Sequence, residues 1–217
     1  MSRIRLAASR AILAIAALLL CGVGFGAPRA EVRPSILVLG DSLSSEYGLP
    51  RDTGWVKLLA NRLASAAPGG GKYSVENASI SGETTSGGRT RLPALLAQHR
   101  PAVVVIELGS NDALRGLPLA ELRDNLRQMV AASRASGARV LLIGMRIPPN
   151  YGRDYADRFA AMFAEIARAQ KVALVPFLLE GFADKLEYFQ ADRIHPNERA
   201  QKMMLDTVWP KLRPLLN

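Results

Sequence analysis

Ser42, Asp192 and His195 are the residues whose types and spacing could carry out nucleophilic chemistry. A serine hydroxyl is a weak nucleophile at neutral pH and needs an adjacent base. The chain has only two histidines, and His99 ends a helical stretch, where a solvent-facing cation explains it. His195 follows Asp192 by three residues, a spacing that lets the carboxylate accept the imidazole N–H and fix its tautomer. His195 is therefore the better candidate base.

Ser42 by itself permits two interpretations. It follows an apolar run and Gly40-Asp41, with a helix expected after it, so its hydroxyl could be presented at the positive end of that helix. It could equally be an ordinary helix N-cap. The motif G-x-S-x-G is absent because Ser44 stands where its last glycine belongs, which argues against the α/β-hydrolase type of nucleophile turn.

Acyl transfer also needs donors aimed at the oxyanion of the tetrahedral intermediate. The candidates are the backbone N–H of Gly82, the side-chain amide of Asn111 and the backbone N–H of Ser42. A tight-turn glycine and an Asx-turn would explain Gly82 and Asn111 equally well.

The elements that must position these residues follow an alternating pattern. Short β-branched apolar runs alternate with longer amphipathic segments, as in strand, crossover helix and parallel strand. We expect a three-layer α/β/α sandwich with a mostly parallel five-stranded sheet, its strands at residues 35–39, 73–77, 103–108, 140–143 and 172–175. Helical stripes of core residues lie between them, and a final helix is expected from about Pro196 toward Leu212.

The candidate residues all fall where such a fold gathers its chemistry. Parallel sheets bind ligands at the carboxyl ends of their strands, where loops lead into helices. The loops after the first three predicted strands hold Ser42, Gly82 and Asn111, and a fourth segment near the end holds Asp192 and His195. We therefore expect these four segments to meet at one edge of the sheet.

Residues 1–30 predict a signal peptide, with three arginines in the first ten residues followed by an uncharged, largely apolar stretch. One alternative is an uncleaved membrane anchor, since the uncharged run reaches the roughly 18 residues that span hydrocarbon. The other is lipidation at Cys21, which the bulky Leu20 before it disfavours. We expect export to the periplasm and one domain over residues 31–217, with an uncertain cleavage site.

Composition excludes several classes of function. Removing the four arginines of residues 1–30 from 28 basic residues leaves 24 against 19 acidic residues, a net charge of +5. No run of Lys and Arg is interleaved with aromatics, so no nucleic-acid partner is expected, although weak association with a membrane surface fits the charge. The single cysteine lies within the predicted leader, so a disulfide, a thiolate nucleophile and a Cys/His zinc cluster are excluded from the remainder.

Taken in order, these segments resemble the conserved blocks of the SGNH hydrolases, also called GDSL esterases and lipases. The resemblance is closer to the bacterial thioesterase I/protease I/lysophospholipase and arylesterase branch, and it covers essentially the whole chain after the leader. The segments that carry it are Gly40-Asp41-Ser42-Leu43, Asn77-Ala78-Ser79-Ile80-Ser81-Gly82, Leu92-Pro93-Ala94-Leu95-Leu96, Gly109-Ser110-Asn111-Asp112-Ala113-Leu114-Arg115-Gly116, Pro149-Asn150-Tyr151-Gly152 and Asp192-Arg193-Ile194-His195-Pro196-Asn197.

This resemblance implies a small flavodoxin-like hydrolase fold with Ser42 as nucleophile, His195 as base and Asp192 as its orienter. Ser42, Gly82 and Asn111 would form the oxyanion hole, with no metal or organic cofactor. The expected function is an exported serine esterase that cleaves carboxylic esters or thioesters of the lysophospholipid, aryl or acyl type through an acyl-serine intermediate. The expected partner is a small-molecule or lipid ester, with no obligatory protein partner.

Departures from the branch bear on substrate preference. Ser45 and Glu46 stand where small residues are usual, and Glu46 is expected to place a carboxylate near the acyl route. Glu83 replaces a common Asp, and Arg193 lies where a smaller residue is frequent. Two alternatives stay open: a carbohydrate acetylesterase on the same scaffold, and a non-catalytic cell-envelope binding protein that has kept the fold.

Overall fold

Five short strands form one sheet in which every pairing is parallel. Their order is β2-β1-β3-β4-β5, and they are β1 (Ser35–Gly40), β2 (Ser74–Asn77), β3 (Val103–Glu107), β4 (Arg139–Ile143) and β5 (Ala173–Val175). Each bound lies within one residue of the prediction, which confirms the five strands. The computed structural model describes residues 33–65 and 71–216, so the predicted signal peptide and Cys21 lie outside the described residues.

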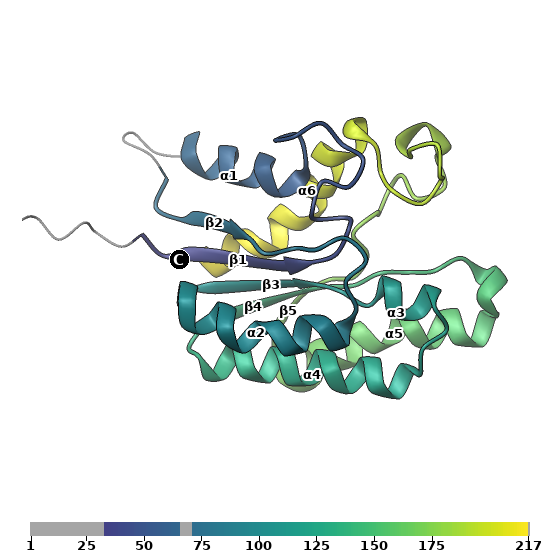
Figure 1. Ribbon diagram of the computed structural model, residues 1–217, viewed down its shortest axis with the longest axis horizontal. Coiled ribbons are helices and arrows are strands. Elements are labelled where there is room, and N and C mark those ends of the chain that lie inside the picture. The colour runs from purple at the N-terminus through teal and green to yellow at the C-terminus, as the bar shows by residue number, and fades with distance from the viewer. Residues whose placement is uncertain (1–32, 66–70, 217) are drawn as a thin grey trace, which may run out of the picture. The chain divides into compact units, whose positions relative to one another are not determined.

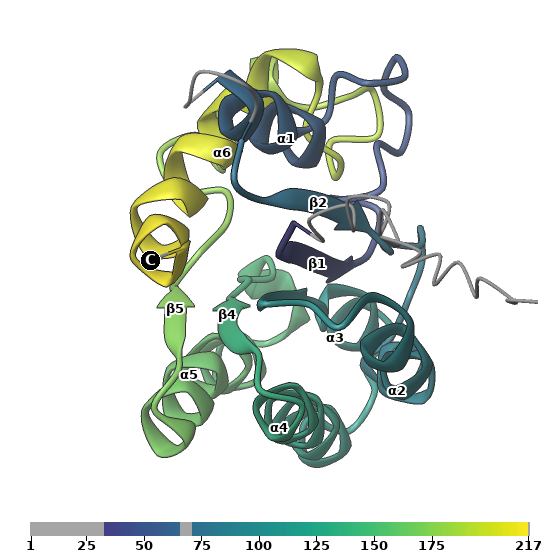
Figure 2. The ribbon, with the colours of Figure 1, turned by 90° about the vertical axis from the view of Figure 1, so that its left-hand side faces the viewer.

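Helices cover both faces of the sheet and confirm the three-layer sandwich (Figures 1 and 2). One layer holds α1 (Trp55–Ser65) and α6 (Glu198–Leu212), and the opposite layer holds α2 (Thr85–His99), α4 (Leu119–Ala135) and α5 (Arg153–Gln170). The short helix α3 (Ser110–Leu114) and the 3₁₀ turns η1 (Pro149–Tyr151), η2 (Leu186–Tyr188) and η3 (Arg213–Leu216) complete the chain. Among the described helices, none is long and apolar enough to cross a bilayer.

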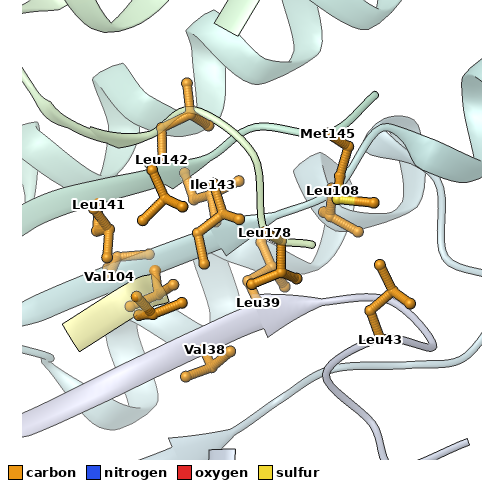
Figure 3. Close-up of a cluster of buried hydrophobic side chains, with 14 of the residues drawn as sticks. Val38, Leu39, Leu43, Val104, Leu108, Leu141, Leu142, Ile143, Met145 and Leu178 are labelled. Atoms are coloured by element: carbon orange, nitrogen blue, oxygen red, sulfur yellow. The ribbon is translucent and has the colours of Figure 1, made fainter. Parts of the chain in front are cut away.

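Burial explains why the central strands are apolar at almost every position. All residues of β1 and β3 are buried, because helices pack on both faces of a parallel sheet. The expected helical stripes face this sheet, including Phe159, Met162, Phe163 and Ile166 of α5. The core extends to the carboxyl end of the strands, where Leu43 lies near Leu39 and Leu108 (Figure 3). The residue that follows Ser42 is thereby anchored in the core.

The strand order has a switch point where the site is expected. β1 lies between β2 and β3, so the connections that leave β1 and β3 at their carboxyl ends lead to opposite layers. Such a switch point opens a crevice outside the strand ends. Ser42 follows β1 and Asn111 follows β3, so both lie at this switch point.

Three local details of the structure differ from the expectations. Ser42 is followed by turns rather than directly by a helix, because Glu46 and Gly48 adopt positive φ angles, and α1 begins only at Trp55. Asn111 lies in the first turn of α3 rather than in a loop. The final helix begins at Glu198, slightly after the expected start, with Asn197 as its N-cap.

Candidate active site

Ser42, His195 and Asp192 form one hydrogen-bonded series, although the serine and the histidine are far apart in sequence. His195 Nε2 lies 2.9 Å from Ser42 Oγ, and His195 Nδ1 lies 2.7 Å from Asp192 Oδ2. Both distances are within hydrogen-bonding range. The Ser42 and His195 side chains therefore lie on the same side of the molecule, as a nucleophile and its base must.

The loop around Asp192 keeps its carboxylate ionised. Asp192 Oδ1 accepts hydrogen bonds from the backbone N–H groups of Ile194 at 2.9 Å and His195 at 3.0 Å. Burial alone would raise the pKa of Asp192, but the hydrogen bonds from the His195 ring and these two N–H groups outweigh it and lower the pKa from 3.8 to about 2. An ionised carboxylate only accepts hydrogen bonds, so Nδ1 carries the imidazole proton and Nε2 is free to accept from the Ser42 hydroxyl.

Tyr47 contacts the candidate base from the side of the nucleophile. Its ring centroid lies 4.4 Å from that of His195 with an interplanar angle of 43°. The contact limits the orientations open to the imidazole. Tyr47 directly follows Glu46 in the chain, and no pattern in the sequence indicated its contact with His195.

Two backbone N–H groups of the predicted oxyanion site are available as donors. The N–H groups of Ser42 and Gly82 make no hydrogen bond to another described residue. Gly82 has a φ of +78°, a conformation that side-chain-bearing residues rarely adopt, and its carbonyl accepts a 3.0 Å hydrogen bond from Arg115 Nη2. Residues with unpaired backbone donors at a strand end can stabilise a negatively charged oxygen.

Asn111, the third candidate donor, is held differently. Its Nδ2 group lies 3.0 Å from Asp41 Oδ2 and 3.0 Å from the Glu83 carbonyl oxygen. An amide nitrogen has two hydrogens, so both are engaged in this structure. Asn111 could donate to a substrate oxygen only if the amide hydrogen that it now donates to the Glu83 carbonyl is shared with that oxygen or turned toward it.

Two buried carboxyl groups lie beneath this loop. Asp41 is 1% exposed and Glu107, at the end of β3, is completely buried. Glu107 Oε2 accepts hydrogen bonds from the Ser44 hydroxyl at 2.7 Å and the Asp41 backbone N–H at 3.3 Å. Ser44 Oγ in turn accepts from the indole N–H of Trp55 at 3.2 Å. Gly40 is required here, because a Cβ on it would lie 2.8 Å from Glu107 Oε2.

Burial shifts the protonation of both acids. Desolvation raises the pKa of Asp41 from 3.8 to about 6, against the hydrogen bonds from Leu43 and Asn111 that lower it. Desolvation and the nearby charge of Asp41 raise the pKa of Glu107 well above its usual range. Burial therefore favours the protonated form of both acids.

Asp112 fixes the short helix that carries Asn111. Its carboxylate accepts from the Thr85 backbone N–H at 2.9 Å and from the Thr85 hydroxyl at 2.6 Å, and Asn125 Nδ2 donates to the same hydroxyl at 3.1 Å. All three side chains are buried. This network joins α3 to the start of α2 and to α4.

The three departures from the family pattern have local roles in the structure. Glu46 binds its own loop, accepting from Gly54 N–H at 2.8 Å and Asp52 N–H at 3.0 Å, while its place near the acyl route stays a prediction. Glu83 forms a 2.7 Å ion pair with Arg91 Nε. Arg193 adopts a positive φ of 60° within the turn before His195.

The structure thus gathers every predicted site residue at one edge of the sheet, while their catalytic roles stay predictions. Reasoning from the sequence missed the contributions of Asp41, Glu107 and Tyr47. An available signal was the charged Glu107 inside an otherwise apolar strand, because a buried charge in a strand needs a partner. No group of three or more potential metal ligands occurs among the described residues.

Comparison with known proteins gives the chain its relatives. It is 52% identical to esterase TesA of Pseudomonas aeruginosa over 182 residues, and this aligned region covers 84% of this chain and 89% of the relative. It is 42% identical over 189 residues to thioesterase 1/protease 1/lysophospholipase L1 of Escherichia coli, covering 87% and 88%.

Solved structures similar to this chain include the same relative and another esterase. A crystal structure of TesA matches with a TM-score of 0.80 and 52% identity over 84% of this chain and 99% of that chain. The psychrotrophic esterase EstA from Pseudoalteromonas sp., solved with monoethylphosphonate as inhibitor, matches with a TM-score of 0.79 and 40% identity over 84% and 98%. Residues 38–203 match the GDSL-like lipase/acylhydrolase family. The chain therefore belongs to the GDSL-like lipase/acylhydrolase family.

Proposed function

We propose that the protein hydrolyses carboxylic esters and thioesters through an acyl-enzyme on Ser42. The observation that carries this proposal is the 2.9 Å contact between Ser42 Oγ and His195 Nε2, backed by the 2.7 Å contact between His195 Nδ1 and Asp192. The names of the relatives, an esterase and a thioesterase/lysophospholipase, support the same reaction class.

In the proposed reaction, His195 takes up a proton and gives it back both when the acyl-enzyme forms and when it is hydrolysed. Ser42 Oγ attacks the acyl carbon as His195 Nε2 takes its proton, and the resulting oxyanion accepts hydrogen bonds from the backbone N–H groups of Ser42 and Gly82. The protonated imidazole, stabilised by Asp192, gives the proton to the leaving alcohol or thiol as the C–O or C–S bond breaks. Water then attacks the acyl-serine with His195 again as base, which releases the acid and restores Ser42.

Asn111 would add a third donor to the same oxyanion. Asp41 holds one of its amide hydrogens at 3.0 Å, and this hydrogen bond fixes the plane of the amide. The hydrogen that points at the Glu83 carbonyl is then the one to be shared with the oxyanion. We propose that this sharing occurs when substrate enters.

Exposed apolar side chains favour lipid-like or aryl esters as substrates. The large hydrophobic side chains that are exposed in the described residues all lie on segments that follow the carboxyl ends of the strands: Tyr47, Ile80, Leu117, Tyr151, Leu186 and Ile194. Apolar exposure concentrated beside a site indicates an apolar ligand or surface. We propose a lysophospholipid, aryl or acyl ester as substrate, with weak and transient contact with membrane surfaces.

The carbohydrate acetylesterase alternative receives less support. A sugar-binding platform commonly uses an exposed aromatic face, and the sequence has two tryptophans. Trp55 is fully buried and bonded to Ser44, and the Arg62 guanidinium lies over the ring of Trp209 at 5.3 Å. Neither offers an open ring next to Ser42.

A rate series on p-nitrophenyl and thiol esters of increasing acyl length tests the proposal. Residues 31–217 should hydrolyse activated esters, and Ser42→Ala should abolish turnover while the protein stays folded. Ser136→Ala, which removes a serine hydroxyl bonded locally to the Ser133 carbonyl, is the matched control and should keep the wild-type rate. Absence of turnover on every ester would revive the non-catalytic alternative.

We further propose that residues 1–30 direct export to the periplasm and are removed. The basic start and apolar centre of this segment support the proposal. Mass spectrometry of the protein recovered from a periplasmic extract should give a chain without the leader. An intact N-terminus in the membrane fraction would indicate an anchor, and a lipid adduct on Cys21 would indicate a lipoprotein.

A further inference from the structure

We propose that Gln190 is a positioning residue that sets the distance between Ser42 and His195. The inference rests on the proposed function, since it assigns a role in the same reaction. Gln190 contacts neither the reacting hydroxyl nor the imidazole, so it is not a catalytic residue.

A continuous path of hydrogen bonds through Gln190 joins the two catalytic segments. The Tyr47 N–H donates to the Ser42 carbonyl at 3.4 Å, and the Tyr47 carbonyl accepts from Gln190 Nε2 at 2.8 Å. The Gln190 backbone N–H then donates to the His195 carbonyl at 2.8 Å. Both ends of the path are main-chain groups of the residues that must react together.

Gln190 also closes the turn that presents His195. Its Nε2 lies 3.2 Å from the Pro196 carbonyl, and its own carbonyl accepts from the Arg193 N–H at 3.0 Å. The neighbouring Phe189 and Pro196 form an isolated antiparallel bridge, which places the two arms of the turn side by side. One side chain thus holds both arms of this turn and the carbonyl of Tyr47.

The nucleophile side accommodates this contact closely. A Cβ on Gly48 would lie 2.1 Å from Gln190 Oε1, and Gly48 has a φ of +68°. Tyr47, held by its carbonyl, lays its ring against His195 with centroids 4.4 Å apart. Gln201 makes a second connection, from the Pro196 and Asn197 carbonyls to Trp55, but it meets the chain well beyond Ser42.

The chemistry requires such a tie because proton transfer is sensitive to small displacements. A misplacement of about 1 Å can lower a rate by about a hundredfold. The turn that carries Asp192 and His195 is otherwise open to solvent, with Ile194 55% exposed. Without the Gln190 amide, the Tyr47 carbonyl next to the nucleophile loses its hydrogen bond to the His195 turn, and the ring contact of Tyr47 with His195 and the more distant Gln201 link remain.

Gln190→Met tests the proposal, because methionine has the length of glutamine but cannot donate to the Tyr47 carbonyl. We expect kcat and the rate of phosphonylation of Ser42 to fall by about tenfold to a hundredfold, with KM unchanged. Gln170→Met is the matched control: Gln170 is also half-buried and its Nε2 also donates to a distant carbonyl, that of Arg127 at 2.9 Å, but in the α4–α5 layer. The control should keep the wild-type kcat.

A measurement that needs no substrate separates this proposal from the proposed function. The sequence has two histidines, so NMR of ¹⁵N-labelled imidazole rings reports on His195 with His99 as internal reference. In Gln190→Met the His195 ring signals should shift or broaden while those of His99 stay in place. Loss of ester turnover in the wild-type protein would overturn the proposed function alone.

Two results would overturn the role of Gln190. The first is a Gln190→Met protein with wild-type kcat and unchanged His195 signals. The second is a loss of thermal stability that lowers the amount of folded enzyme but leaves kcat per folded molecule intact. If Gln190→Met does not fold, Gln190→Glu keeps the length and turns a carboxylate toward the Tyr47 and Pro196 carbonyls, and the same fall in kcat with unchanged KM is expected.

Discussion

The segment that carries Ser42 and the segment that carries His195 meet at one edge of the sheet but are held in place by different means. Beneath Ser42 lie Asp41 and Glu107, both almost fully buried. The Asp41 backbone N–H donates a hydrogen bond to Glu107 Oε2. Around His195 the chain is open, and the Asp192 side chain is 37% exposed. The nucleophile thus depends on a buried network, whereas the base depends on a turn that binds its own backbone.

This difference assigns separate tasks to the acidic residues. Asp192 is ionised and acts directly on the imidazole. Glu107, whose pKa is raised by burial, supports Ser44 and the Asp41 backbone. Substitution of these acids should therefore affect different quantities, catalysis for Asp192 and stability for Glu107.

Asp192→Asn should cause the largest loss. An asparagine amide can donate to Nδ1 and favour the wrong imidazole tautomer, so kcat should fall by about 10⁴-fold, as for comparable triads. Steady-state kinetics on a p-nitrophenyl ester, with the far-UV circular dichroism spectrum as a fold control, measures the effect. A wild-type rate would show that another group orients His195.

Asn111→Ala should have a smaller but specific effect. Loss of one oxyanion donor should lower kcat by about a hundredfold to a thousandfold with little change in KM. Asn125→Ala, which removes an amide that donates to the neighbouring Thr85 hydroxyl, separates loss of the donor from a general disturbance of α3. A change confined to KM would make Asn111 a substrate-binding residue instead.

Glu107 substitutions should separate shape from charge. Glu107→Leu leaves the Ser44 hydroxyl and the Asp41 N–H without their acceptor, at a cost of about 1–3 kcal/mol in stability for each buried group. Glu107→Gln keeps an acceptor oxygen and mimics the protonated acid that burial favours, so kcat should change little. Urea unfolding measures the first effect and steady-state kinetics the second. A collapse of kcat in Glu107→Gln would mean that ionised Glu107 is needed.

The pH dependence of stability gives a test of sign. Because the folded-state pKa of Glu107 is raised, the unfolded chain releases a proton that the folded chain keeps, so wild-type stability falls as pH rises above the ordinary glutamate pKa of 4.5. Glu107→Gln should lose this part of the fall. Parallel urea-unfolding curves for the two proteins from pH 4 to about pH 7 would contradict a protonated Glu107.

Asp192 should have the smallest effect, and the opposite sign. Its pKa is lowered to about 2, so the stability it contributes is present above about pH 4 and is lost as pH falls toward 2. Solvent screening of this partly exposed group makes the contribution modest. Comparison of wild type with Asp192→Asn by urea unfolding at pH 2 and pH 5 measures it. An equal difference in stability at both pH values would contradict the shift.

The sequence predicted most of the fold because burial on both faces leaves a clear signal. The apolar runs of β1 and β3 are buried throughout, so their pattern alone locates them. The prediction of a helix directly after Ser42 was wrong, because the course of this segment depends on positive φ angles at Glu46 and Gly48 and on contacts with residues far away in the sequence. Such contacts leave no periodic pattern in the sequence.

The candidate site was predictable to the level of residue type. The scarcity of histidine singled out His195, and the Asp-x-x-His spacing singled out Asp192. The supporting contacts were not predictable. Glu107 and Ser44 are 63 positions apart in the sequence, and Gln190 and Tyr47 are 143 apart, so only the folded chain brings them together.

Covalent labelling tests the central claim most directly. A p-nitrophenyl alkylphosphonate should modify residues 31–217 once, release one equivalent of p-nitrophenol, and place the adduct on the peptide that contains Ser42, with Asp192→Asn slowing the reaction. Unmodified Ser42→Ala protein would agree with this account. An adduct on any other residue, or equal labelling of Ser42→Ala, would contradict it.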